Sequence, residues 1–255
     1  MRARNIVLLG LAAYALFVVA TLPARWAATR LQLPPGIALS AVSGTVWKGS
    51  AQASATGDAS GAGTRLQWHF LPARLVAGRL AFAVHASGPA LEGEAEIARG
   101  PGELEARAVR ARLDASRLAA LVPLLAPWRP QGTVTLEAPA LAWDGRNARG
   151  RASAEWRDAA LALTDVRPLG SYRVEARADG GPLELAVTTL QGPLAVSGRG
   201  TFAPPAALAF SGEARAEGSG DAALEPLLNL LGPRRADGAR TLQWGSPPQT
   251  NPPRS

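Results

Sequence analysis

The sequence contains no cysteine, so disulfide bonds, thiol catalysis and cysteine-based zinc sites are excluded. This is compatible with an oxidising compartment but does not identify one. Histidine is also scarce, because His69 and His85 are the two in the chain. Both lie in strand-like runs, where surface histidines are far more common than zinc ligands. The sequence therefore predicts neither a metal site nor a cofactor.

Lysine is the next scarce residue, since Lys48 is the single lysine and arginine supplies the remaining positive charge. The net charge is +7, but the arginines are scattered in ones and twos along the chain. Nucleic-acid-binding proteins usually gather their positive charge on one surface. The pattern is typical of an ordinary basic surface, and we expect no nucleic-acid partner.

Lys48 belongs to the glycine-bounded stretch GTVWKG, residues 44–49, which raises the question of a phosphate-binding loop. Such a loop has the order GxxxxGK[ST], with the lysine after the glycine and a helix following. Here Lys48 precedes Gly49, and the next residues have no helical period. We therefore interpret Gly44 and Gly49 as bends around a short strand that buries Trp47, with Lys48 facing water.

Catalytic motifs are equally absent from the sequence. It has no GxSxG nucleophile elbow. The acids of LEGEAEI, residues 91–97, alternate along one face of a predicted strand, with Arg99 and Arg107 nearby in sequence. A solvated charged face explains them, and we do not expect an enzyme.

Charge is missing from one long segment, residues 6–22, IVLLGLAAYALFVVATL. About 17–25 apolar residues can cross a bilayer as a helix, whereas a cleavable signal peptide usually has an apolar region of about 7–15 residues. Val18-Val19-Ala20 could serve as a cleavage site, but it lies inside the apolar run. We expect an uncleaved transmembrane signal anchor that contacts the lipid bilayer.

The anchor implies an order for the rest of the chain. Residues 1–5 are expected on the cytoplasmic side, and residues 23–35 form a juxtamembrane stalk with Trp26 at the far interface. The remaining residues are then periplasmic.

From residue 36 onward, apolar and polar residues alternate. Leu66, Trp68 and Phe70 do so in RLQWHF, and LAFAV, YRVEA and LELAV repeat the pattern. Strict alternation is typical of half-buried antiparallel strands, and SGPA, RGPG, DGG and QGP supply turns between them. We predict a β-rich domain over residues 36–244 and a disordered, proline-rich tail over residues 245–255.

Two segments have helical spacing instead: residues 114–128, DASRLAALVPLLAPW, and residues 221–235, DAALEPLLNLLGPRR. Each opens on an aspartate, a good N-cap, so we expect two short helices. Leucines, one proline and one glycine match at a constant offset between the two segments. The pairs are Leu118 with Leu224, Leu121 with Leu227, Leu124 with Leu230, Leu125 with Leu231, Pro127 with Pro233 and Gly132 with Gly238. We interpret residues 115–136 and 221–242 as copies of a duplicated unit, with chance similarity in an Ala/Leu-rich chain as the alternative.

Four tryptophans fall in or beside predicted strands: Trp47, Trp68, Trp143 and Trp156. Buried aromatic rings of this size dominate a thin core. Tryptophan is also enriched at binding hot spots, so an exposed groove or partner surface is the alternative.

The order of these motifs resembles protein N of the bacterial type II secretion system. The motifs are GTVWKG, LQWHFLPARLVAGRL (66–80), QGTVTLEAPALAW (131–143), GRASAEW (150–156), PLGSY (168–172) and QGPLAVSG (191–198). The family offers no catalytic residue to transfer, so its signature positions are expected to be structural. They are Gly44, Trp47, Gly49, Leu66, Trp68, Pro72, Gly78, Gly132, Trp143, Trp156, Pro168, Leu169, Gly170, Tyr172, Gly192 and Gly198.

The resemblance implies a single-pass inner-membrane protein with a β-rich periplasmic domain. It implies a role in moving folded proteins across the outer membrane, with other inner-membrane and periplasmic secretion components as partners. The chain is also similar to AsmA-like envelope proteins, which implies an antiparallel sheet curled into a groove. That similarity leaves a lipid- or hydrophobe-handling protein, with bound lipid, as the alternative function.

Overall fold

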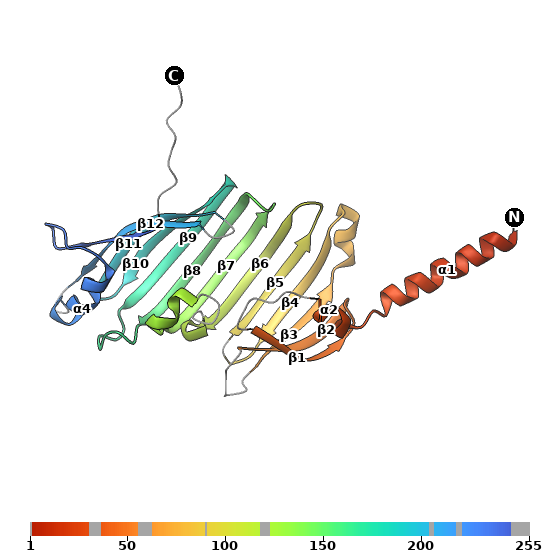
Figure 1. Cartoon of the computed structure of the whole chain (residues 1–255), viewed down its shortest axis with the longest axis horizontal. Helices are drawn as coiled ribbons and strands as arrows, with labels where there is room; N and C mark the ends of the chain where they lie inside the picture. Colours follow the sequence, from red (N-terminus) through yellow and green to blue (C-terminus); the bar gives the residue numbers. More distant parts are fainter. Residues whose placement is uncertain are drawn as a thin grey trace, which may run out of the picture.

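The computed structural model describes residues 2–30, 37–55, 63–89, 91–117, 123–203, 207–217 and 221–245. Its main feature is one open antiparallel sheet of 13 strands, in which each strand pairs with its neighbours in the sequence (Figure 1). The prediction of a mainly β, antiparallel domain is confirmed. The predicted tail lies outside the described residues from residue 246 onward.

The strands follow the alternating runs of the sequence. They are β1 (Ile37–Gly44), β2 (Lys48–Ala55), β3 (Thr64–Phe70), β4 (Leu80–Ser87), β5 (Leu91–Arg99), β6 (Leu104–Asp114), β7 (Gln131–Trp143), β8 (Ala148–Ala160), β9 (Gly170–Gly181), β10 (Leu183–Gln191), β11 (Leu194–Ala203), β12 (Ala207–Ala216) and β13 (Arg240–Trp244). Among the described residues, short 3-10 helices and one α-helix interrupt the meander. They are η1 (Pro72–Ala77), η2 (Ala115–Arg117), η3 (Pro123–Trp128) and α4 (Asp221–Leu231).

Antiparallel pairing gathers the connections at two opposite margins of the sheet. The first margin carries the β1–β2 turn, η1 and the turns that follow β5, β7 and β9. The second margin carries η2, η3, the loop between β8 and β9, and α4. These two margins differ in covering, because the larger helical segments belong to the second.

In the described residues before the sheet lie two helices, α1 (Arg2–Ala20) and α2 (Ala24–Ala28). Figure 1 shows α1 extending away from the sheet beyond β1 and β2. Large apolar side chains of α1, including Leu8, Leu11 and Phe17, are exposed. Among the described residues, no helix combines the length and mean hydropathy needed to cross a membrane. The predicted anchor is not supported by this finding and stays a prediction.

The described part of the predicted stalk is packed against the sheet. Pro23 forms an isolated antiparallel bridge with Thr45, and the Val46 backbone N–H donates to the Leu22 carbonyl at 3.0 Å. Ala24 at the start of α2 is buried. The start of the chain is therefore tied to the turn between β1 and β2.

The main hydrophobic core lies at the second margin, beneath α4. Leu224, Leu227 and Leu228 of α4 pack against Leu194 and further apolar residues of β11 to β13. This confirms the predicted helix but corrects its phase, because Leu228 is buried whereas Leu230 is exposed. The spacing of the leucines alone allows either Leu228 or Leu230 to face the sheet, and the position of the helix over the sheet decides which one is buried.

The first predicted helix is wrong over its described residues, which form only the 3-10 turns η2 and η3. Pro123 and Pro127 lack the N–H that an α-helix interior needs. Asp114 does act as a cap, since its Oδ1 accepts the Ser116 N–H at 2.9 Å. Leu118 and Leu121 lie outside the described residues. The proposed duplication stays a prediction.

Candidate functional site

The sheet has one apolar face and one charged face. Directly paired residues of antiparallel strands share a face, and the observed register carries a continuous apolar set from β1 to β13. This apolar face includes Leu39, Leu66, Trp68, Phe82, Val84, Ile97, Leu136, Trp156, Val174, Leu185, Phe210 and Trp244. The alternation in the sequence therefore corresponds to two chemically different surfaces.

Only parts of the apolar face are covered by other described segments. α4 and Trp128 of η3 cover it near the second margin. Near the first margin, the Trp47 ring packs edge-on against Phe70, with ring centroids 5.0 Å apart. Elsewhere no other described segment covers the apolar face, and many of its side chains are half-exposed. An uncovered apolar surface of this kind marks an interaction site.

The exposed apolar side chains of this face are most concentrated between β4 and β7, at the first margin. Leu80, Arg99, Leu104 and Trp143 form one row across these strands, and Ile97 adjoins it on β5. We call these five residues the margin patch. Its apolar members are 40% (Leu80), 41% (Ile97), 38% (Leu104) and 38% (Trp143) exposed.

Sequence reasoning singled out Trp143 but missed the other four residues of the margin patch. The signal for Ile97 and Arg99 was available, because residues two apart on a strand share a face. The register that brings Leu80 and Leu104 beside Arg99 could not be read from the sequence.

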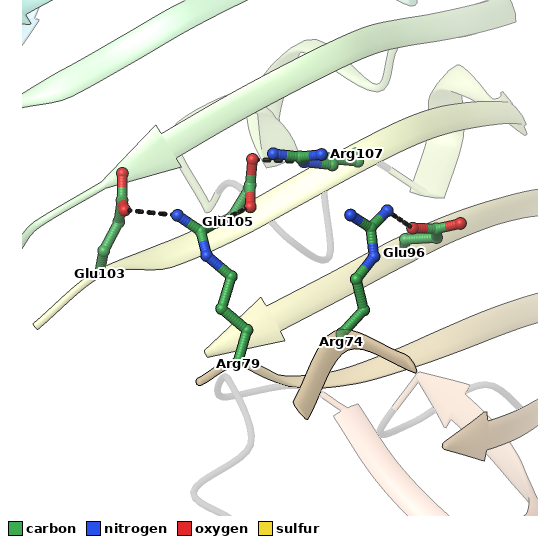
Figure 2. A network of polar contacts seen from close by, with 6 residues as sticks. All are labelled: Arg74, Arg79, Glu96, Glu103, Glu105 and Arg107. Carbon is green, nitrogen blue, oxygen red and sulfur yellow. Dashed lines mark hydrogen bonds and ion pairs between the residues drawn. The ribbon is translucent and has the colours of Figure 1, made fainter. Parts of the chain in front are cut away.

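The opposite, charged face is tied together by ion pairs. Glu105, which is 7% exposed, accepts hydrogen bonds from Arg79 and Arg107. Arg79 also contacts Glu103 at 3.3 Å (Figure 2). Because Arg79 lies two residues after η1, these contacts fix the end of η1 to β6. The network explains the placement of η1 and has no reacting group beside it.

Further glutamates of this face pair with arginines in the same way. Glu96 on β5 contacts Arg74 of η1 at 2.8 Å (Figure 2), and Glu94 contacts Arg110 at 3.1 Å. The predicted charged face of LEGEAEI is therefore confirmed. Glu94 and Glu96 serve ion pairs between neighbouring elements.

Glu155 on β8 has two arginine partners on the same face. Arg173 Nη2 lies 2.7 Å from Glu155 Oε1, and Arg157 Nη2 lies 2.8 Å from Glu155 Oε2. These hydrogen bonds, that from Arg173 first, hold the pKa of the Glu155 carboxyl below its ordinary value.

We expect Glu155→Gln to change how stability depends on pH. A carboxyl whose pKa is lower in the folded state stabilises the fold above its unfolded pKa of about 4.3 and loses this contribution as pH falls through the folded pKa. The variant should therefore lose less stability than the parent protein when pH is lowered from 5 to 3 (roughly the window set by that shift). Urea midpoints across this range measure the effect. Glu184→Gln is the control, since Glu184 forms no ion pair with the described residues; equal flattening in both variants would contradict the assignment.

His69 and His85 lie on the charged face, as predicted for surface histidines. Their rings are nearly parallel, with centroids 6.5 Å apart. Within the described ranges, no group of three or more His, Cys, Asp or Glu side chains is arranged to hold a metal ion.

An open cavity of about 740 Å³ crosses strands β9 to β13. Charged and hydroxyl side chains that share the charged face line it, among them Arg177, Glu184, Arg199, Thr201 and Ser211. Arg177 is paired with Glu175 at 3.4 Å. The lining combines both charge signs without a nucleophile held beside a base.

The signature residues of GTVWKG form the tight turn between β1 and β2. Gly44 has φ of 87°, and a Cβ there would lie 2.5 Å from the Lys48 carbonyl oxygen. Trp47 lies in the turn itself and is half-buried, which corrects the prediction of a strand that buries it. Its Nε1 donates to the Val19 carbonyl at 2.7 Å, and Trp68 Nε1 donates to the Thr45 carbonyl at 3.3 Å. The two rings thus link the turn to α1 and β3.

Trp47→Ala should destabilise the protein by about 1–3 kcal/mol, below the range of about 3–5 kcal/mol for a fully buried ring. Lys48→Ala is the matched control, because Lys48 is exposed and its loss should change stability by less than about 0.5 kcal/mol. Thermal melts of the two purified variants compare them. A larger loss of stability for Lys48→Ala than for Trp47→Ala would contradict the packing described for this turn.

Two distant signature motifs meet at the second margin. The Leu194 N–H donates to the Leu169 carbonyl at 3.1 Å, and the Tyr172 hydroxyl donates to the Leu194 carbonyl at 2.9 Å. Burial raises the pKa of Tyr172. A Cβ on Gly192 would overlap the Cα of Gly170. PLGSY and QGP therefore interlock, which their separation in the sequence did not reveal.

Other signature residues support individual elements. Trp156 Nε1 donates to the Gln131 carbonyl at 2.9 Å, and the Trp156 ring lies 6.1 Å from that of Tyr172. Pro72 opens η1 and Gly78 ends it. Two further signature glycines lie against aromatic rings: Gly49 against Trp68 and Gly198 against Phe210. The other signature residues are Leu66 on the apolar face, Gly132 near the start of β7, and Pro168, which follows a cis peptide bond. Trp143 stands apart from these because it is exposed.

A single open sheet with one apolar and one charged face defines a β-rich protein whose surfaces are suited to binding. The described residues bring together no constellation of catalytic side chains. A family model for "Type II secretion system (T2SS), protein N" matches residues 35–243. The chain belongs to this family, which confirms the resemblance seen in the motifs, and it is a type II secretion component. No curated protein and no solved structure gave a significant match.

Proposed function

We propose that this protein supports export of folded proteins across the outer membrane as an inner-membrane-anchored part of the type II secretion system, acting through protein contacts in the periplasm. The observation that carries the proposal is the uncovered apolar face, in a chain that belongs to the protein N family. Extended exposed apolar surfaces are rare on soluble proteins and mark sites of interaction. Export through contacts needs such a surface and no catalytic group.

The anchoring part of the proposal rests on α1. Its exposed side chains are apolar along most of the helix, and Arg4 and Arg25 lie on either side of the uncharged run. A helix that is apolar all round is suited to apolar surroundings. Beyond it, Arg30 lies over the Trp26 ring at 4.9 Å, a pairing suited to a membrane interface. Carbonate extraction should leave the full-length chain in the membrane pellet; its release would contradict the anchoring alone.

Affinity capture tests the function. The tagged full-length protein, expressed at its native level and lightly cross-linked in its own membrane, should bring down inner-membrane and periplasmic secretion components. A tagged, unrelated single-pass protein of the same membrane is the control. Recovery of no secretion component above that control would contradict the proposal.

The second candidate is a lipid- or hydrophobe-handling protein. It is favoured by the continuity of the apolar face across the sheet and by its incomplete cover. Such a face could hold acyl chains, as the similarity to AsmA-like proteins implies. Native mass spectrometry of the detergent-purified protein should then show retained lipid, and its absence would count against this function.

A further inference from the structure

We infer that the margin patch is a docking surface for an apolar segment of a partner protein that carries a carboxylate among its apolar side chains. This inference rests on the proposed function, since it specifies where one periplasmic contact is made. The residues concerned are Leu80, Ile97, Arg99, Leu104 and Trp143.

The margin patch has the composition of an interface hot spot. Leu104 and Trp143 are directly paired on the neighbouring strands β6 and β7, and Leu80 of β4 lies in the same row on the other side of Arg99. Hot spots are enriched in tryptophan and arginine, and the contacts around them exclude water. A segment lying across this row would bury the Trp143 ring and the leucines together.

Arg99 identifies the charge of the partner. Several arginines of the charged face pair with carboxylates, such as Arg74 with Glu96 at 2.8 Å and Arg110 with Glu94 at 3.1 Å, whereas others there face solvent. Arg99 projects from the apolar face and has no hydrogen bond or ion pair with the described residues. A carboxylate can pair with a guanidinium in bidentate geometry. An acidic residue on the partner therefore complements this position.

The patch is held in place by its neighbours. The β5–β6 turn is closed by the Gly100 N–H, which donates to the Glu103 carbonyl at 2.9 Å. In the β7–β8 turn, Asp144 Oδ1 accepts the backbone N–H groups of Arg146 at 2.9 Å and Asn147 at 2.7 Å. Strands fixed in this way lose little conformational freedom on binding.

The same margin argues against an anionic membrane as the occupant. Recognition of anionic lipid surfaces uses clusters of about 4–8 basic residues. The margin patch has one arginine, and the adjoining turns add Arg146 together with the acids Glu103 and Asp144, so no basic cluster forms. One arginine is too few for such a surface, whereas a protein segment can present a single carboxylate to Arg99.

Site-specific photo-cross-linking tests the inference. p-Benzoylphenylalanine replaces Trp143 in the full-length protein, in cells that contain the complete secretion system, and the same probe at His85 on the charged face is the control. We expect the Trp143 position, and not His85, to cross-link to a segment of another secretion component. That segment should contain an Asp or Glu among apolar residues.

Charge reversal then tests the role of Arg99. Arg99→Glu should lower the cross-linking yield at least about tenfold, and an Asp or Glu→Arg change in the cross-linked segment should restore it. Arg146→Glu makes the same charge change at an exposed residue of the neighbouring β7–β8 turn, outside the margin patch, and should leave the yield unchanged. Thermal midpoints check that the variants fold, and Arg99→Gln replaces Arg99→Glu if the latter does not.

Three outcomes would overturn the inference. The first is a cross-linking yield at Trp143 no higher than at His85, and the second is cross-linking only to a second copy of this chain. The third is an Arg99→Glu variant that no longer floats with phosphatidylglycerol vesicles but still cross-links to the partner protein. If affinity capture still recovers secretion components in any of these cases, the proposed function stands and the margin patch alone is excluded.

Discussion

Leu227→Ala is expected to destabilise the protein by about 3–5 kcal/mol, the upper part of the range for a buried leucine. Leu227 is 1% exposed and lies in the cluster formed by α4 and strands β11 to β13. The sheet is one layer thick over much of its described area, so this cluster is its main core. The cavity left by the lost side chain cannot collapse easily, because leucines from both α4 and the strands border it.

Urea unfolding of the purified protein measures this effect. Leu230→Ala is the matched control on the same helix, since Leu230 is 67% exposed. Its substitution should cost less than about 0.5 kcal/mol. Equal losses in the two variants would show that α4 does not pack through the side that faces β11 to β13.

Gly192→Ala should have the second large effect, a loss of about 3 kcal/mol or more. Gly192 has φ of 125°, which side chains rarely allow, and a Cβ there would lie 2.7 Å from the Leu169 carbonyl oxygen as well as overlapping Gly170. Two backbones would have to move apart to admit it. The hydrogen bond between Leu194 and Leu169 would then be strained.

Circular dichroism melts and the yield of folded protein test this prediction. Gly181→Ala is the control, because a Cβ at Gly181 meets nothing within 4 Å. The control should melt close to the parent protein. A Gly192→Ala variant that melts like Gly181→Ala would show that PLGSY and QGP do not interlock as described.

The sequence was most informative about the strands. Alternation in RLQWHF placed Trp68 and Phe70 on one face and His69 on the other, as the register confirms. This works because side chains of a strand alternate strictly between faces. Helix phase was less predictable, and Leu228 rather than Leu230 faces the core.

Contacts between distant motifs could not be predicted. Nothing in PLGSY indicates that Leu169 receives a hydrogen bond from Leu194, because that contact depends on how β9, β10 and β11 are aligned. The family signature at these positions is explained by close backbone packing. The candidate site was predicted only through Trp143, since its exposure depends on what covers the apolar face.

Secretion by a strain lacking this protein tests the central claim most directly. The amount of a folded type II substrate is measured in the medium and in the periplasm, with the intact gene restored on a plasmid as the control. The account predicts that the substrate accumulates in the periplasm of the deletion strain and returns to the medium on complementation. Undiminished secretion by the deletion strain would contradict it.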